Sequence, residues 1–336
     1  MIVDGGIGPD LAKAGASAKE QEDLGFDGAW AAETNVDPFL ALTLAAEHTT
    51  RLELGTGIAV AFARSPMTVA QTAYNLNAFA EGRFMLGLGS QVKAHITRRF
   101  SMPWSHPAPR MREFILALHA IWGSWAEGTK LDFRGDFYEH TLMTPFFDPG
   151  PNQFGAPRVY LAAVGELMTK VAGEVADGML CHGFTTESYL REVTVPAVTT
   201  GLDASGRTRA DIQLSLPAFV VTGATEEAMA AADKAVRGQI AFYASTPSYR
   251  GVLEHHGWGD LQSELNPMSR EGLWAEMGER IDDDVLHAFA VVAEPDQLAQ
   301  GLLDRYGDLV DRVSFYTPYR SAEGVFDPVG ERLRAG

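Results

Sequence analysis

The sequence is short of cysteine, of basic residues and of long apolar runs, and each shortage excludes a class of protein. Its single cysteine, Cys181, can form neither an internal disulfide nor a cysteine-based zinc site. The 27 Lys and Arg residues face 44 Asp and Glu residues, and a formal net charge of -17 repels nucleic acid and anionic lipid. No apolar run approaches the roughly 20 residues that cross a bilayer, and the opening MIVDGGIG is unlike a signal peptide. We expect a cytoplasmic protein that binds no nucleic acid and no membrane.

Strand-like and helix-like segments alternate along the chain with short connections, which is the pattern of a parallel sheet. Eight segments have strand character: Met1–Asp4, Asp27–Glu33, Arg51–Val60, Arg83–Leu88, Arg158–Ala163, Gly178–His182, Ile212–Thr222 and Arg312–Tyr316. Helices are predicted between them at Pro9–Leu24, Asp37–Glu47, Ser65–Glu81, Pro109–Trp125, Glu166–Ala176, Thr185–Leu202, Thr225–Ser245 and Pro295–Tyr306.

Eight strands alternating with helices favour an α/β fold, the (β/α)8 TIM barrel. An open doubly wound sheet is the rival, but no G-x-G-x-x-G follows the first strand, where the chain reads GGIGP. We predict a single domain over residues 1–336. It carries a loop and hairpin insertion after strand 4, at about residues 90–157, and a helical insertion after strand 7, at residues 246–293.

The residues that follow the strands are the candidates for an active site, because a TIM barrel builds its site at the C-terminal strand ends. They are Glu33, Thr34, Gly57, Ile58, Gly89, Ser90, Gln91, Ala163, Val164, Gly165, His182 and Gly183. Backbone N–H groups near Gly165 open a helix at the barrel mouth, where phosphate binds well. Gly165 and Gly183 equally fit the simpler role of permitting tight turns.

A basic segment stands out in this acidic chain. Residues 93–112 contain no Asp or Glu, and their basic side chains are Lys93, His95, Arg98, Arg99, His106, Arg110 and Arg112. A positive patch beside the mouth would attract an anionic ligand, whereas a solvated loop that pairs with acidic neighbours is the alternative. His95 and His182 are candidates for proton exchange near neutral pH, and each is also compatible with a plain hydrogen-bonding role.

Other residues give weaker signals. We predict no metal site, because His255 and His256 are adjacent on a helical segment and no third ligand converges on them. Cys181 follows a buried strand and is expected to be inert. The aromatic residues of the second insertion and the preceding helix indicate either an apolar substrate or simple core packing; they are Phe242, Tyr243, Tyr249, Trp258 and Trp274.

Taken together, the motifs resemble the luciferase-like monooxygenase superfamily, and within it the actinobacterial class that uses the deazaflavin coenzyme F420. The matching segments span nearly the whole chain: GFDGAWAAET, RLELGTGIAVAFARSPMTVAQTA, GRFMLGLGSQVKAHITRRFSMPW, PAPRMREFILALHAIWGSW, VYLAAVGELMTKVAGEVADGMLCHGF and DRVSFYTPY. Each motif alone is weak, but their order and spacing are specific for the superfamily.

The resemblance implies a cofactor ring across the strand ends, above a cis peptide bond at Gly57–Ile58. It implies a phosphate site at Ala163, Val164 and Gly165, with His182 and Gly183 opposite. Glu33 occupies the position where many relatives carry an acidic residue. Two positions depart from dehydrogenase relatives: Thr34 replaces a catalytic histidine, and Val92 stands where they have a glutamate. The sugar-phosphate dehydrogenase mechanism is therefore not expected to carry over.

The function expected is an F420-dependent oxidoreductase that exchanges a hydride with a small, apolar organic molecule. Glu33, Ser90 and Gln91 would contact the ring or its side chain. The basic segment, with Lys93 among its residues, would hold the anionic tail, and His95 or His182 would exchange the proton that accompanies the hydride. An FMN-dependent monooxygenase of the same superfamily and a non-catalytic flavin-binding protein are the alternatives. The superfamily resemblance also implies a homodimer.

Overall fold

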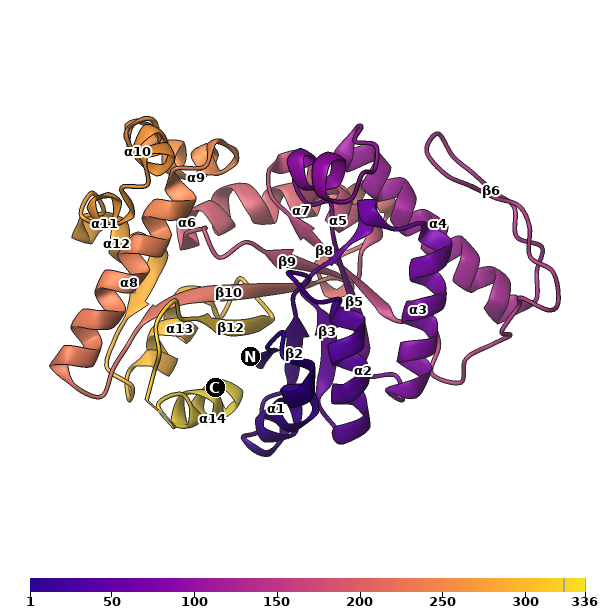
Figure 1. The fold of residues 1–336 in the computed structure, drawn as a ribbon, viewed down its shortest axis with the longest axis horizontal. Helices are drawn as coiled ribbons and strands as arrows, with labels where there is room; N and C mark the ends of the chain where they lie inside the picture. The colour runs from indigo at the N-terminus through magenta and orange to yellow at the C-terminus, as the bar shows by residue number, and fades with distance from the viewer. Residues whose placement is uncertain (323, 336) are drawn as a thin grey trace.

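The structure is a computed structural model and describes residues 1–322 and 324–335. Eight parallel strands close into a barrel with helices around it (Figure 1). The barrel strands are β1 (Ile2–Ile7), β2 (Gly28–Ala31), β3 (Glu53–Thr56), β5 (Phe84–Gly89), β8 (Arg158–Ala163), β9 (Gly178–Cys181), β10 (Gln213–Val221) and β12 (Arg312–Tyr316). Each pairs with the next, and β12 pairs with β1, so the ring closes. The predicted TIM barrel is confirmed.

The helices begin where the sequence provides capping residues. α1 (Leu11–Asp23), α2 (Pro38–His48) and α3 (Pro66–Phe79) follow caps whose side chains accept hydrogen bonds from first-turn N–H groups; the caps are Asp10, Asp37 and Ser65. Proline fits the first position of α2 and α3, because the N–H of that position has no hydrogen-bond partner within the helix. The other long helices around the barrel are α4 (Pro107–Glu127), α5 (Glu166–Val175), α8 (Glu226–Ala244) and α13 (Leu298–Tyr306).

Several elements differ from the prediction. The predicted strand Arg51–Val60 is divided into β3 and β4 (Ala59–Val60), because the chain turns at Gly57–Ile58. The predicted helix Thr185–Leu202 is divided into α6 (Glu187–Tyr189), the π-helical turn η3 (Leu190–Thr194) and α7 (Val195–Ser205). The sequence prediction misses α14 (Asp327–Ala335), which packs against α13 and β1. A helix this short depends on such packing more than on local propensity.

Both predicted insertions are present. The first contains a π-helical turn, η2 (His95–Arg99), and a small antiparallel hairpin of β6 (Phe133–Arg134) and β7 (Glu139–His140). The second contains η5 (Pro247–Tyr249), α9 (Arg250–His255), α10 (Gly259–Glu271), α11 (Trp274–Gly278) and α12 (Asp283–Phe289). It ends in an unpredicted strand, β11 (Ala290–Val292), which runs parallel to β10 and extends the sheet outside the ring. None of the described helices combines the length and apolar character that a membrane span needs.

Two hydrophobic clusters hold the described residues together. The larger joins the barrel strands to the surrounding helices and includes Leu54, Leu161 and Val313, all without exposed surface. The smaller lies between β10, α8 and the second insertion, and Phe219, Ile240 and Leu265 are fully buried in it. The insertion therefore has a packed base of its own beside the barrel mouth.

A buried charge network fills part of the barrel interior. Arg312 on β12 is fully buried, and its Nε and Nη2 donate to the Asp4 carboxylate on β1 at 2.8 and 2.7 Å. Its Nη1 donates to Glu53 Oε2 on β3 at 2.6 Å, and Glu53 also binds Arg158 on β8. Trp30 Nε1 donates to Asp4 at 2.9 Å. These bonds link five strands, including the seam at which the barrel closes.

We predict that Arg312→Met lowers the free energy of unfolding by about 3–5 kcal/mol, because it leaves Asp4 buried without its cation. Denaturant unfolding checks this value. Arg191→Met is the matched control, since Arg191 forms only exposed ion pairs with Glu187 and Asp308, and its cost should stay below about 1 kcal/mol. Equal losses in the two variants would contradict a special role for the seam pair.

Candidate functional site

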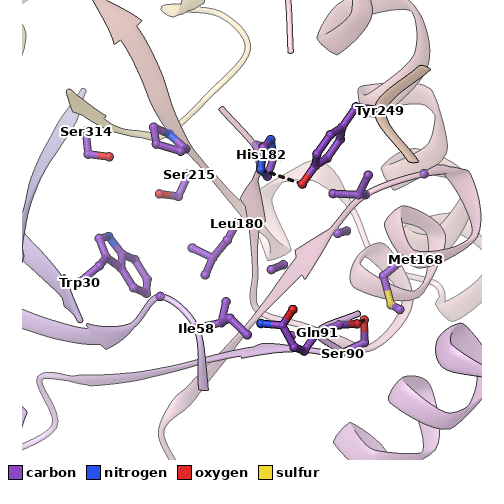
Figure 2. Close-up of a pocket in the computed structure, with 18 of the residues that line it drawn as sticks. Trp30, Ile58, Ser90, Gln91, Met168, Leu180, His182, Ser215, Tyr249 and Ser314 are labelled. Atoms are coloured by element: carbon purple, nitrogen blue, oxygen red, sulfur yellow. Dashed lines mark hydrogen bonds between the residues drawn. The ribbon is translucent and has the colours of Figure 1, made fainter. Parts of the chain in front are cut away.

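A cavity of about 1570 Å³ opens at the C-terminal ends of the barrel strands. Its walls come from strands, helices and both insertions, which Figure 2 shows converging on one space. Most of the sequence-predicted site residues line it: Gly57, Ile58, Gly89, Ser90, Gln91, Lys93, Ala163, Val164, Gly165 and His182. Glu33, Thr34, His95 and Gly183 are not among the residues that line this cavity.

Glu33 lies behind the Gly57–Ile58 turn and braces it. Its carboxylate accepts hydrogen bonds from the Val60 N–H and from Arg64 Nη1, both at 2.7 Å, and its N–H donates to the Ile58 carbonyl at 3.1 Å. Arg64 is tied in turn to Asp37 at 2.8 Å. With Oε2 already shared by two donors, Glu33 supports the wall of the cavity from outside.

Another part of the cavity wall contains the start of α5. Gly165 precedes the helix with φ 79° and ψ 156°, a conformation that residues with a side chain rarely adopt. The N–H groups of the first turn lack partners within a helix by geometry, and Gly165, Glu166, Leu167 and Met168 all line the cavity. A side chain at position 165 would have open space, with no atom within 4 Å of its Cβ. This wall can therefore hold an anionic group against backbone donors.

The predicted basic segment is divided by the fold. Lys93 and His106 line the cavity, whereas Arg110 is buried against Tyr138 and the Pro103 carbonyl. Arg112 pairs with Glu174, and the exposed Arg99 donates to the Thr34 carbonyl. The expected positive patch at the cavity is therefore reduced to Lys93, with His106 beside it. His95 is exposed on η2 and lies outside the cavity lining.

His182 is held in a defined state. Its Nδ1 accepts a hydrogen bond from the Phe184 N–H at 3.0 Å, and its Nε2 lies 3.0 Å from the Tyr249 hydroxyl. The ring stacks on Tyr249 with centroids 4.5 Å apart and meets Tyr243 edge-on at 4.8 Å. Burial lowers the pKa of His182 to about 4, so the ring is neutral at physiological pH. This state disfavours His182 as the proton-exchanging acid that the sequence suggested.

Comparison with known proteins identifies the family. The sequence model of the luciferase-like monooxygenases matches residues 2–312. The chain belongs to the luciferase-like monooxygenase family. An uncharacterized protein of Mycobacterium tuberculosis is 55% identical over 313 residues, which are 93% of this chain and 92% of that protein. A 5,10-methylenetetrahydromethanopterin reductase of Methanolobus tindarius is 28% identical over 284 residues, with coverage of 83% and 82%.

The luciferase-like fold is also seen in solved structures. The coenzyme F420-dependent tetrahydromethanopterin reductase of Methanopyrus kandleri superposes with a TM-score of 0.79 at 22% identity, covering 99% of this chain and 98% of its own. At this identity the similarity establishes the fold alone. Family membership makes the protein an oxidoreductase. The Gly57–Ile58 peptide bond is cis, as the resemblance to luciferase-like proteins implied.

The weaker sequence signals have structural explanations. His255 and His256 are bonded to the hydroxyls of Ser188 and Thr186. Among residues 1–322 and 324–335, no group of three or more His, Cys, Asp or Glu side chains is placed to hold a metal. Burial raises the pKa of the Cys181 thiol to about 12, which agrees with an inert thiol. Of the five aromatic residues considered in and before the insertion, Tyr249 alone lines the cavity.

Sequence reasoning missed the residues that face inward from the barrel strands. Trp30, Leu180, Ser215 and Ser314 line the cavity beneath its mouth (Figure 2). The alternation of side chains along a strand could have predicted them, because every second residue of a strand points to the same face. Ser314, for example, is two residues from Arg312 on β12. The position of Tyr249 had no comparable signal, since its approach to the cavity depends on how the second insertion packs.

The lowered pKa of His182 predicts a pH-dependent loss of stability. The unfolded chain binds a proton at this ring with a pKa near the ordinary value of about 6.5, whereas the folded protein binds it only near pH 4. The unfolded state therefore binds more protons between these values, and stability falls as the pH drops below about 6.5. Urea unfolding at pH 7 and 5 should show that wild type loses about 2 kcal/mol more than His182→Gln. Identical losses in both proteins would contradict the buried neutral ring.

Proposed function

We propose that this protein is an F420-dependent oxidoreductase that transfers a hydride between the deazaflavin and a small apolar organic molecule. The main support is the combination, in one cavity, of a wide space beside the Gly57–Ile58 turn and a helix start at Gly165. A planar ring joined to an anionic tail would suit this combination. F420 is favoured over FMN because the structurally similar tetrahydromethanopterin reductase of Methanopyrus kandleri depends on coenzyme F420.

The cavity walls fit such a cofactor. Ile58 and Gly89 are in contact, because a Cβ on Gly89 would lie 2.5 Å from the Ile58 side chain. Position 89 therefore needs a glycine beside Ile58. Ser90 and Gln91 follow directly and supply polar groups beside it. When bound, the deazaflavin supplies a ring carbon that donates or accepts a hydride.

The chain's own residues would bind and orient the cofactor and the substrate, and would exclude water from them. Apolar side chains around the cavity make it suitable for an apolar substrate; they include Ile58, Val92, Trp104, Met168, Leu180, Phe315 and Phe326. Around a bound cofactor and substrate, these side chains would keep water from the hydride. Lys93 at the rim provides a mobile positive charge for the anionic tail.

Cofactor choice is tested by titrating the purified protein with F420 and, in parallel, with FMN. We expect micromolar quenching of F420 fluorescence and at least about tenfold weaker binding of FMN, a difference of about 1.4 kcal/mol. Tight FMN binding without F420 binding would replace the proposal by the monooxygenase alternative.

Reduced F420 is then offered a panel of ketones, imines and activated alkenes, and its oxidation is followed by absorbance. Binding without turnover of any of them would favour a non-catalytic role.

Gly165→Ala tests the helix start. The added methyl meets no atom within 4 Å, but a backbone at φ 79° and ψ 156° disfavours alanine by about 1–3 kcal/mol. We expect the turn to shift and F420 affinity to fall about tenfold or more, while circular dichroism and cooperative unfolding persist. Gly128→Ala is the control for a left-handed glycine, because Gly128 ends α4 with φ 65° away from the cavity. If Gly165→Ala bound F420 with unchanged affinity, the anionic group of the cofactor would not bind at the start of α5.

A further inference from the structure

The hydrogen bonds of His182 determine which way the Tyr249 proton points. Since Nδ1 accepts from the Phe184 N–H, it carries no proton, and a neutral ring must carry its proton on Nε2. Nε2 then donates to the Tyr249 oxygen 3.0 Å away. The Tyr249 O–H is therefore free to donate to another group. Burial raises the pKa of Tyr249 to about 12, so this hydroxyl keeps its proton at physiological pH.

Tyr249 lies where two cavities meet. Beside the main cavity is a smaller one of about 150 Å³, between the start of α5 and the second insertion. Eight residues line both cavities, and they come from the end of β8, the start of α5, the end of β9 and η5: Ala163, Val164, Gly165, Glu166, Cys181, His182, Ser248 and Tyr249. Figure 2 shows the Tyr249 ring reaching from the insertion toward His182 and the barrel mouth. The insertion thus brings a phenol donor to cavities that the first turn of α5 also lines.

A second donor points to a ligand at this junction. Thr185 is only 6% exposed and lines the smaller cavity. Its Oγ1 is buried and has no hydrogen-bond partner among the described residues. A buried hydroxyl without a partner is unfavourable, and a ligand oxygen or a bridging water would supply the missing hydrogen bond. Glu166 is the acidic side chain that lines both cavities, and Lys170 Nζ donates to its carboxylate at 2.6 Å.

We propose that Tyr249, oriented by His182, donates a hydrogen bond to the phosphate group of the cofactor, so that the second insertion completes the anion site begun by the first turn of α5. This inference rests on the proposed function, because it assigns the phosphate of F420 to that site. Tyr249 is a binding residue, and His182 is a positioning residue that acts through it.

The test compares two ligands that differ in the phosphate. Wild type, Tyr249→Phe and Tyr243→Phe are titrated with F420 and with the deazaflavin core that lacks the phosphate and tail. Tyr249→Phe should weaken F420 binding about tenfold or more, as expected for a lost hydrogen bond to a charged group. Binding of the core should change by less than about twofold, because the phenyl ring still stacks on His182.

Tyr243→Phe is the matched control. Its hydroxyl belongs to the same aromatic cluster but is bonded to Tyr316 at 2.8 Å and lines neither cavity. Both affinities should be unchanged in it. Equal weakening of F420 and the core in Tyr249→Phe would mean that the hydroxyl faces the ring, and no weakening would mean that it contacts no part of the cofactor. Either result overturns the proposal.

Inorganic phosphate separates this inference from the identity of the cofactor. At about 50 mM it should raise the thermal unfolding midpoint of wild type and Tyr243→Phe, and raise that of Tyr249→Phe much less. This outcome would support the anion site even if F420 failed to bind, in which case FMN and riboflavin replace the two deazaflavins. Equal stabilisation of all three proteins, or of none, would contradict a phosphate donor at Tyr249.

Discussion

The closure of the barrel is the constraint on which every feature of the site depends. Arg312 lies fully buried on the last strand, holds Asp4 of the first strand through two bonds, and reaches Glu53 on β3. A buried guanidinium without these carboxylates would be strongly destabilising, so the network ties the seam to one arrangement. With the seam fixed, strand ends that are distant in sequence meet at one mouth, and Gly57, Gly165 and Ser314 face the same cavity.

The two sides of the mouth are built by different means. On one side, Glu33 and Arg64 form a buried ion pair behind the Gly57–Ile58 turn and hold its backbone in place. On the other side, the helix start at Gly165 offers backbone donors, and the second insertion brings Tyr249 beside them. In this protein with a formal net charge of -17, the proposed anion site would consist mostly of neutral donors, with Lys93 as the cation. Neutral donors fixed in direction need little reorganisation when a ligand arrives.

The second insertion shows how a common barrel acquires its own site. Its helices pack on β10 and α8 through a separate cluster of buried apolar side chains. The insertion therefore has a hydrophobic core of its own. Four of the five aromatic residues considered in and before it serve packing or surface roles, and only Tyr249 reaches the cavity. Variation in such connections, on an unchanged barrel, is how members of one fold come to bind different molecules.

The sequence by itself determined the order of strands and helices, the barrel, and the glycine and small-residue turns of the mouth. These follow from local patterns: alternation of strand and helix, capping residues such as Ser65, and glycine where a turn needs it. Only the tertiary structure decided which polar side chains face the ligand space. Glu33 follows a strand as Ser90 does, yet Arg64 and the Val60 N–H hold it behind the wall. Tyr249 enters the cavity because a packed insertion and the hydrogen bond to His182 direct it there. Such choices depend on partners far away in sequence, because a side chain turns toward whichever donor, acceptor or apolar surface the fold brings within reach.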